Sequence, residues 1–403
     1  MNPTRISSRI RRIKPSASSA AADRFAELKR QGQDIINLAI GEPDFDTPEH
    51  IRIAGCKAIE SGDTRYTAVA GTLALRQAIV AKLQWENGLE YEPRDVIVTC
   101  GAKHALFNAL SVTVEAGHEV IVPAPFWVSY PDMALACDGT PVIVICKEED
   151  DFRLTPEALE AAITPATRWL VFNSPTNPTG TTYTTDQLRA LAAVLVRHPQ
   201  VMVLADDIYE HIRFAETDRP RHLLEIEPSL RDRTLIVNGV SKTYAMTGWR
   251  VGYAVGPADI IAAMDMLQSQ STSGACSISQ SAAVTALNSE ADFLPGWVAL
   301  YKARRDTAVR MLNDIPGIRC RAPGGAFYLY PWCGGLIGRR TPEGKTLESD
   351  LDVVIYLLEA GSVMVLAGSA YGVSPYFRMS IATSVELIEE GCRRISRAIA
   401  ALA

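Results

Sequence analysis

The stretch TLIVNGVSKTYAMTGWRVGYAV, residues 234–255, places two short apolar runs on either side of a small polar loop. Continuous runs of β-branched residues are typical of strands that are buried on both faces of a sheet. The loop between the runs holds one lysine, Lys242, and one arginine, Arg250, which follows eight residues later. A lysine among small and apolar neighbours calls for an explanation, and the organisation of the whole chain offers one.

Similar apolar runs recur along the chain and alternate with helical patterns. Each run is four to six residues long and rich in β-branched side chains, and strand–helix alternation of this kind predicts a mainly parallel α/β sheet flanked by helices. We expect a sheet of seven strands. The predicted strands lie in DVIVTC (95–100), EVIVP (119–123), PVIVIC (141–146), WLVFN (169–173), VMVLADD (201–207), TLIVN (234–238) and VGYAV (251–255).

The composition limits the classes of function. Of the 403 residues, 47% are hydrophobic and 21% are charged, and the formal net charge is −6, which argues against a nucleic-acid partner. No apolar run is long enough to span a membrane. The eight cysteines show no CxxC pairing and the six histidines no metal-ligand spacing, so we expect reduced thiols, no metal and a cytoplasmic protein.

The pattern of the chain changes near residue 290. A long charged helical pattern precedes GAFYLYP and FRMSIA, which is α+β in character. We therefore predict a large domain over 48–292, and a smaller α+β domain made of 1–47 and 293–403. The first residues are rich in Arg and Ser, a composition shared by mitochondrial transit peptides, although a mobile basic arm is the expectation that we favour.

Four polar features follow predicted strands: GAKH (101–104), NSPTNPTG (173–180), DDIYE (206–210) and Lys242. Each alone is explained as well by turn or capping chemistry. Ligands of open α/β sheets, however, bind beyond the carboxyl ends of the strands, where all four features converge. A helix start for phosphate, an aspartate for a ring nitrogen and a lysine for an aldehyde are together what pyridoxal 5'-phosphate requires.

The chain resembles the class I aminotransferases of fold type I, and within them the bacterial aspartate and prephenate subgroup. The resemblance extends from IKPSA (13–17) to CRRISRA (392–398). Nine motifs in the same order carry it. They are LAIGEPDFDTPEHI, RYTAVAG, GAKHALFNAL, PAPFWVSYPDM, NSPTNPTG, LADDIYEH, VNGVSKTYAMTGWRVGY, GGAFYLYP and PYFRMSIATS.

This resemblance implies how the chain would hold pyridoxal phosphate. Lys242 would form the Schiff base and, once released by substrate, would move the proton. Asp206 would pair with the ring nitrogen, Tyr209 and Asn177 would hydrogen-bond the ring oxygen, and Trp127 would stack on the ring. A lysine that must swing between cofactor and substrate belongs in a loop, which accounts for its place in the opening stretch.

The resemblance also implies a phosphate site and a partner subunit. The amides of Ala102 and Lys103 would bind the phosphate together with Arg250, whose planar guanidinium suits an anion. Tyr66 would reach the phosphate of a neighbouring subunit. We therefore expect a homodimer with shared active sites.

Substrate recognition is implied in the same way. Arg378 would grip the α-carboxylate of the substrate in a bidentate pair, beside the amide of Gly41. Lys103 would read the distal carboxylate of aspartate or glutamate, and Lys14 is associated with accepting prephenate, although a solvated basic arm explains Lys14 equally well. The implied substrate-binding set is Gly41, Trp127, Asn177, Arg378, Lys103 and Lys14.

These features favour an aminotransferase that moves the amino group between aspartate or glutamate and 2-oxo acids, with prephenate as a further acceptor. An aromatic aminotransferase, a pyridoxal-phosphate lyase and a non-catalytic ligand sensor are the alternatives. The sensor is disfavoured because the fold is expected to begin by Lys14, which leaves no room for a DNA-binding domain. Two departures from the family, Thr243 beside Lys242 and the segment 367–371, leave the side-chain preference open.

Overall fold

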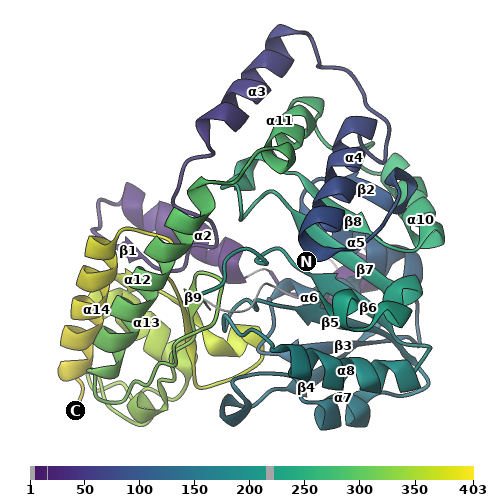
Figure 1. Cartoon of the computed structure of the whole chain (residues 1–403). Helices are drawn as coiled ribbons and strands as arrows, with labels where there is room; N and C mark the ends of the chain where they lie inside the picture. The colour runs from purple at the N-terminus through teal and green to yellow at the C-terminus, as the bar shows by residue number, and fades with distance from the viewer. Residues whose placement is uncertain (1–4, 16, 215–221) are drawn as a thin grey trace.

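The centre of the molecule is a seven-stranded sheet with the order β2-β8-β7-β6-β5-β3-β4 (Figure 1). The computed structural model describes residues 5–15, 17–214 and 222–403. All seven predicted strands form, and the prediction of a mainly parallel sheet is confirmed, with β8 antiparallel to both of its neighbours. The strands are β2 (Val96–Thr99), β3 (Glu119–Ala124), β4 (Thr140–Ile145), β5 (Thr167–Asn173), β6 (Met202–Asp206), β7 (Thr234–Gly239) and β8 (Gly252–Val255).

Helices cover both faces of the sheet because successive side chains of a strand point to opposite faces. In β5, Leu170 packs into the core shared with α4, α8 and α11, whereas Trp169 and Val171 pack into the core shared with α5, α6 and α10. The helices of this part of the chain are α3 (Glu49–Glu60), which packs on α11, and α4 (Leu73–Lys82), α5 (Ala102–Thr113), α6 (Ser129–Ala136), α7 (Pro156–Ala162), α8 (Thr185–Arg197), α9 (Leu223–Ile226), α10 (Ala258–Ser269) and α11 (Ser277–Asn288).

The edge strand β4 differs from the prediction. Its run was expected to be buried on both faces, but Ile143 and Ile145 are 39% and 55% exposed. Within the described ranges the strand pairs with β3 alone, and along it the partly buried Val142 and Val144 alternate with the exposed Ile143 and Ile145. Apolar continuity alone therefore does not distinguish an edge strand from a central one.

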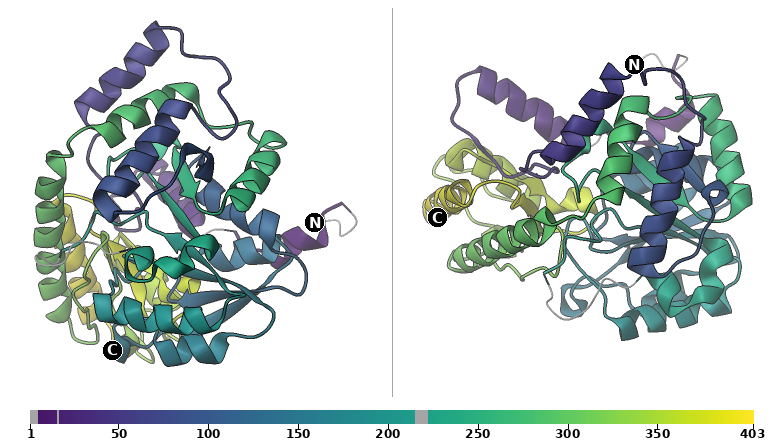
Figure 2. Two further views of the ribbon diagram at one scale, coloured as in Figure 1. Left: turned by 45° about the vertical axis from the view of Figure 1, so that its right-hand side comes forward. Right: turned by 45° about the horizontal axis from the view of Figure 1, so that its top comes forward.

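A second core lies beside the sheet, where the green-to-yellow C-terminal segments gather in both views of Figure 2. Its helices pack around two small sheets, in which β1 pairs with β10 and β12 lies between β11 and β9. This part includes α12 (Phe293–Asn313), α13 (Asp350–Gly361), α14 (Val385–Ala400), β1 (Ile36–Asn37), β9 (Tyr328–Leu329), β10 (Val363–Met364), β11 (Leu366–Ala367) and β12 (Phe377–Ser380).

The N-terminal segment divides between the two parts. Strand β1 joins the second core through β10, and α2 (Ala17–Arg30) precedes it. Helix α1 (Ser8–Arg12) instead packs against α6, one of the helices that cover the central sheet. Arg9 and Arg12 form ion pairs there with Asp138. The domain boundaries at 47/48 and 292/293 stay a prediction. Every helix within the described ranges is too short or too polar to span a bilayer.

Candidate active site

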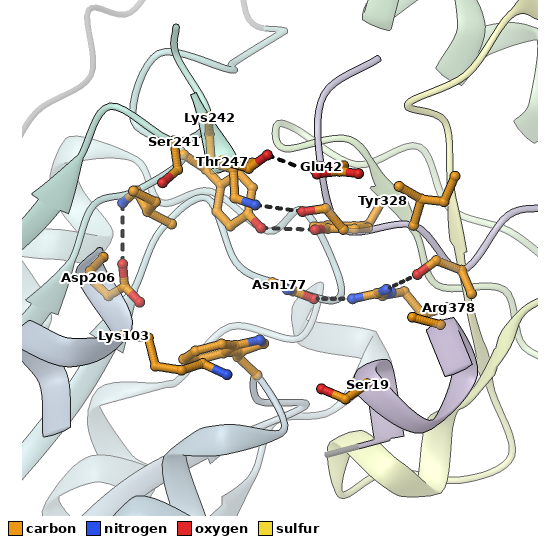
Figure 3. Close-up of a pocket in the computed structure, with 18 of the residues that line it drawn as sticks. Ser19, Glu42, Lys103, Asn177, Asp206, Ser241, Lys242, Thr247, Tyr328 and Arg378 are labelled. Carbon is orange, nitrogen blue, oxygen red and sulfur yellow. Dashed lines mark hydrogen bonds between the residues drawn. The ribbon is translucent and has the colours of Figure 1, made fainter. Parts of the chain in front are cut away.

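A cavity of about 580 Å³ opens at the carboxyl edge of the sheet, between the sheet and the second core (Figure 3). It collects side chains from segments that are far apart in sequence. Ten of the twelve predicted site residues line it: Gly41, Ala102, Lys103, Trp127, Asn177, Asp206, Tyr209, Lys242, Arg250 and Arg378.

The topology of the sheet explains this convergence. Asp206 is the last residue of β6, and Lys242 follows the end of β7 by three residues. Parallel strands bring both to one edge. Strand β8 is antiparallel to its neighbours, so its first residue lies at that same edge. Arg250, which comes just before β8, therefore also reaches the cavity.

Asp206 is held in a buried, polar setting at the end of β6. It is 4% exposed, and its Oδ2 accepts a hydrogen bond from the Tyr130 hydroxyl at 2.6 Å. Its backbone carbonyl accepts from the Asn173 side chain at 2.7 Å. Burial raises the pKa of Asp206 to about 6, although the bond from Tyr130 opposes the shift. Such a carboxylate is stabilised by a cationic partner in the cavity.

Lys242 points into the cavity from its loop. Its Nζ donates to the Gly41 carbonyl at 2.5 Å, a contact drawn in Figure 3. Burial lowers the pKa of Lys242 to about 8, so a larger fraction of the amine is neutral near pH 7 than for an ordinary lysine. A neutral amine is the form that attacks a carbonyl carbon or accepts a proton. Lys242 therefore has the chemistry of a nucleophile and of a base.

An anion cradle lies at the start of α5. The first amides of a helix have no acceptor within the helix, and the helix dipole favours negative charge there. Gly101 has a φ of +86°, and a Cβ at this position would lie 2.3 Å from Arg250 Nη2. The guanidinium is held by the carbonyls of Thr247, at 2.8 Å, and Cys100, at 3.3 Å. Glycine is therefore required for the close approach of the arginine to the helix start.

Arg378 lies on the far side of the cavity, on β12. It is 1% exposed, and it donates to Asn177 Oδ1 at 3.2 Å and to the Ala39 carbonyl at 2.7 Å. Among the described residues, its Nε has no hydrogen-bond partner. Tyr328 and Tyr371 pack on the guanidinium, with ring centroids at 4.4 and 5.3 Å. A buried cation with an unused donor is suited to an anionic ligand.

Among the cavity residues that were not predicted, three have side chains that contact predicted site residues. Tyr130 donates to Asp206, Asn173 accepts from the Asn177 amide at 3.0 Å, and the Tyr328 hydroxyl lies 2.9 Å from that of Tyr209. Tyrosines within apolar patterns are usually core residues, which hides Tyr130 and Tyr328. The usable signal was position: Asn173 ends a predicted strand, as Asp206 does.

Two predicted residues do not line the cavity. The side chain of Tyr66 is 96% exposed. Lys14 is also exposed, and its backbone amide donates to Asp132 of α6 at 3.2 Å. Lys103 does line the cavity, and its Nζ lies 4.7 Å from the centroid of the Trp127 ring. Burial and the neighbouring Arg250 lower the pKa of Lys103.

Comparison with known proteins gives a consistent result. A family model described as "Aminotransferase class I and II" matches residues 33–395. The chain is 53% identical over 388 residues to a "Probable aspartate/prephenate aminotransferase" of Rhizobium leguminosarum bv. phaseoli, covering 96% of this chain and 97% of that protein. It is 50% identical over 397 residues to an "Aspartate/prephenate aminotransferase" of Cereibacter sphaeroides, covering 98% and 99%.

A solved structure is equally similar. The crystal structure of the aspartate aminotransferase from Rhizobium meliloti superposes with a TM-score of 0.96 at 49% identity, covering 99% of this chain and 100% of that chain. The similarity in sequence and in structure therefore extends over nearly the whole molecule.

Proposed function

This chain belongs to the class I and II aminotransferases, and from that premise we propose that it transfers an amino group between aspartate or glutamate and 2-oxo acids, with pyridoxal 5'-phosphate as cofactor. The observation that carries the proposal is the cavity itself. It places a lysine of lowered pKa, a buried carboxylate and an anion cradle within one space, and sets a buried arginine across from them. Prephenate is proposed as a further amino acceptor.

The residues fit this cofactor on physical grounds. The amides of Ala102 and Lys103, with Arg250 beside them, would hold the phosphate. Burial raises the pKa of Asp206, and the protonated ring nitrogen would give its carboxylate a charged partner. When bound, the cofactor supplies an electron sink that stabilises negative charge at the substrate Cα.

The chain's own residues would position the ring and move protons. Trp127 would cover one face of the ring. Tyr209 and Asn177 would donate to the ring oxygen, with Tyr328 holding the Tyr209 hydroxyl. Lys242 would attach the cofactor and then, once released, carry the proton to and from the substrate Cα. Lys242 Nζ donates to the neutral Gly41 carbonyl and not to a carboxylate, so the side chain can exchange this hydrogen bond and swing.

The preference for acidic substrates rests on charge at two places. Arg378, supported by Asn177, would bind the α-carboxylate, with the amide of Gly41 beside it. Lys103 would face the distal carboxylate. The names of the two bacterial relatives include aspartate and prephenate, which supports the same substrates here. For Lys14, its exposed position on the arm tied to α6 would allow it to contact a second carboxylate of prephenate.

The proposal includes a homodimer in the cytoplasm. Tyr66 is a large side chain that is almost wholly exposed in the single chain, as expected if it enters the phosphate site of a partner subunit. All eight cysteines are free thiols, which supports a reducing compartment.

A substrate panel tests the function. Aspartate, glutamate and several apolar and aromatic amino acids are each assayed against 2-oxoglutarate, oxaloacetate and prephenate, with kcat/KM determined for every pair. We expect the highest values for the dicarboxylic donors. Release of pyruvate or ammonia without a 2-oxo acid would instead identify a lyase, and a preference for aromatic donors would reject the proposed substrate class.

A further inference from the structure

A buried polar network lies behind the loop that carries Lys242. The Thr243 hydroxyl lies 3.0 Å from His211 Nδ1, and His211 Nε2 lies 2.8 Å from Glu86 Oε2. Glu86 in turn pairs with Lys82 at 3.0 Å. Lys82 also pairs closely with Glu210, the neighbour of His211 in sequence. The network therefore starts at the residue next to Lys242 and returns to the segment that bears Tyr209.

Two other roles for this cluster are excluded by its geometry. A hydrogen-bonded chain of threonine, histidine and glutamate could activate the threonine hydroxyl as a nucleophile. Thr243, however, is only 3% exposed, so its hydroxyl cannot meet a substrate. Glu86, Glu210 and His211 could also gather round a metal ion. The Lys82 ammonium, however, already lies against both carboxylates and takes the place of a cation.

The network is costly, which suggests a role beyond stability. A buried ion pair often stabilises a fold no better than apolar side chains of similar volume would. Its advantage is that it favours one particular arrangement of the side chains around it. Although burial alone would raise it, the hydrogen bond from His211 and the charge of Lys82 lower the pKa of Glu86 to about 2. The Glu86 carboxylate and the Lys82 ammonium therefore stay charged at neutral pH, and Glu86, paired with Lys82, holds the ring of His211 in place.

Local backbone structure supports this arrangement. Residues Leu83–Asn87 form a π-helical turn, η1, directly after α4. Such turns are rare in proteins as a whole, but those that occur are often found at functional sites. This turn lies between Lys82 and Gly88 and presents Glu86 to His211. A neutral ring would donate to Glu86 and accept from Thr243, whereas a protonated ring would donate to both, so both contacts survive either state.

We propose that His211 is a positioning residue: held by Glu86, it fixes Thr243 and thereby the backbone from which Lys242 reaches the cavity. This inference rests on the proposed function of Lys242. The loop is also held at Ala245, whose carbonyl accepts from the Thr47 hydroxyl at 2.7 Å. These two contacts, at Thr243 and Ala245, both hold the backbone just after the catalytic lysine, and would leave its side chain free while limiting the movement of its Cα.

The test compares variants that separate the two sides of the imidazole. Asparagine places a polar atom near the position of Nδ1, and glutamine places one near Nε2. Thr243→Val and His211→Gln should therefore each lower kcat for aspartate about three- to tenfold, with KM within about twofold of wild type, because one neutral hydrogen bond is lost. His211→Asn keeps the contact with Thr243 but loses the one with Glu86 that orients it, so it should lose less than His211→Gln. The double variant Thr243→Val/His211→Gln should lose no more than the stronger single variant.

Hydrogen exchange of the holoenzyme gives a readout that does not depend on turnover. Amides of 240–246 should exchange at least about threefold faster in Thr243→Val and His211→Gln, with the rest of the sheet unchanged. His198→Gln is the matched control, since His198 Nε2 also contacts a glutamate, Glu160, at 2.7 Å, but far from the cavity in the fold and on the protein surface. It should alter neither kcat nor the loop.

The inference is overturned if Thr243→Val leaves both kcat and loop exchange unchanged, if the losses multiply in the double variant, or if His211→Asn loses as much as His211→Gln. Should His211→Gln fail to fold, Thr243→Val still decides, because it removes only one hydroxyl. A wild-type enzyme without transaminase activity would reject the proposed function instead, and loop exchange would then still test the positioning role.

Discussion

The two sides of the cavity differ in how firmly their side chains are held. On the sheet side, Asp206 and Tyr209 are buried and hydrogen-bonded to tyrosines. On the entrance side, Gly41 and Lys103 are exposed. The buried side suits chemistry that is the same for every substrate, because its groups need no reorganisation. The exposed side is where substrates can be told apart, and substitutions there cost little stability.

The sharpest test of the buried side is Lys242→Ala. General base catalysis alone contributes about 10²–10⁴-fold, and this variant also loses the covalent attachment of the cofactor, so we expect at least about a thousandfold loss of kcat. Mass spectrometry after borohydride reduction should show the cofactor attached to wild type only. An adduct that persists in the variant would assign the lysine role elsewhere.

Asp206→Asn tests the energetic cost of the buried side. Because the folded pKa is about 6 against an ordinary 3.8, the folded protein binds this proton more tightly than the unfolded chain does. Ionising Asp206 therefore costs stability as pH rises from about 4 to 6. In cofactor-free protein the variant should gain roughly 3 kcal/mol over wild type at pH 7 and almost nothing at pH 4. Urea unfolding at both pH values measures this, and an equal gain at both would refute it.

Arg378→Ala tests the contact that every amino acid substrate shares. A buried hydrogen bond to a charged group is worth about 1.5–3 kcal/mol, so KM should rise at least about tenfold for aspartate, glutamate and apolar donors alike. Steady-state kinetics with three donors gives the comparison. A rise confined to one donor would place this arginine among the residues that discriminate.

Lys103→Ala tests the exposed side. Lys103 lines the cavity beside Trp127, and a charge contact in a partly closed site should contribute about tenfold to a hundredfold to kcat/KM for aspartate. An apolar donor should retain more of its activity, because it has no distal carboxylate. Equal losses on both donors would mean that Lys103 serves the cofactor instead of the substrate.

Lys14→Ala is expected to have the smallest effect. The residue is exposed on the N-terminal arm, and surface charge contacts contribute about 0–1 kcal/mol. We expect a loss of up to about fivefold in kcat/KM with prephenate and none with oxaloacetate. Parallel assays with the two acceptors decide this. An unchanged prephenate rate would leave Lys14 as one charge of a solvated arm.

The same contrast describes what could be predicted from sequence. The strands and the residues at their ends, such as Asp206 and Lys242, follow from local apolar runs and from the rule that ligands bind at the carboxyl edge. The orientation of β8 was not specified, although the short connection between β7 and β8 contains no long crossover helix, as an antiparallel pair allows.

Side-chain partners from distant segments could not be predicted. Lys82 meets Glu210, and Glu86 meets His211, across more than a hundred residues, and no local pattern reports these contacts. Tyr130 looked like a core aromatic because its ring is indeed buried; only the position of its hydroxyl at Asp206 reveals its role. Pairing of this kind depends on the completed tertiary structure.

The place of β8 in the sheet has a consequence for synthesis of the chain. Strand β2 lies early in the sequence, but its one strand partner among the described residues is β8, which lies about 150 residues later. A nascent chain that has not yet emerged beyond Val255 therefore carries β2 with both edges open, and open edges invite pairing with other chains. The long loop that must close also slows folding. Ribosome-bound chains shorter than this length accordingly expose a strand whose partner does not yet exist.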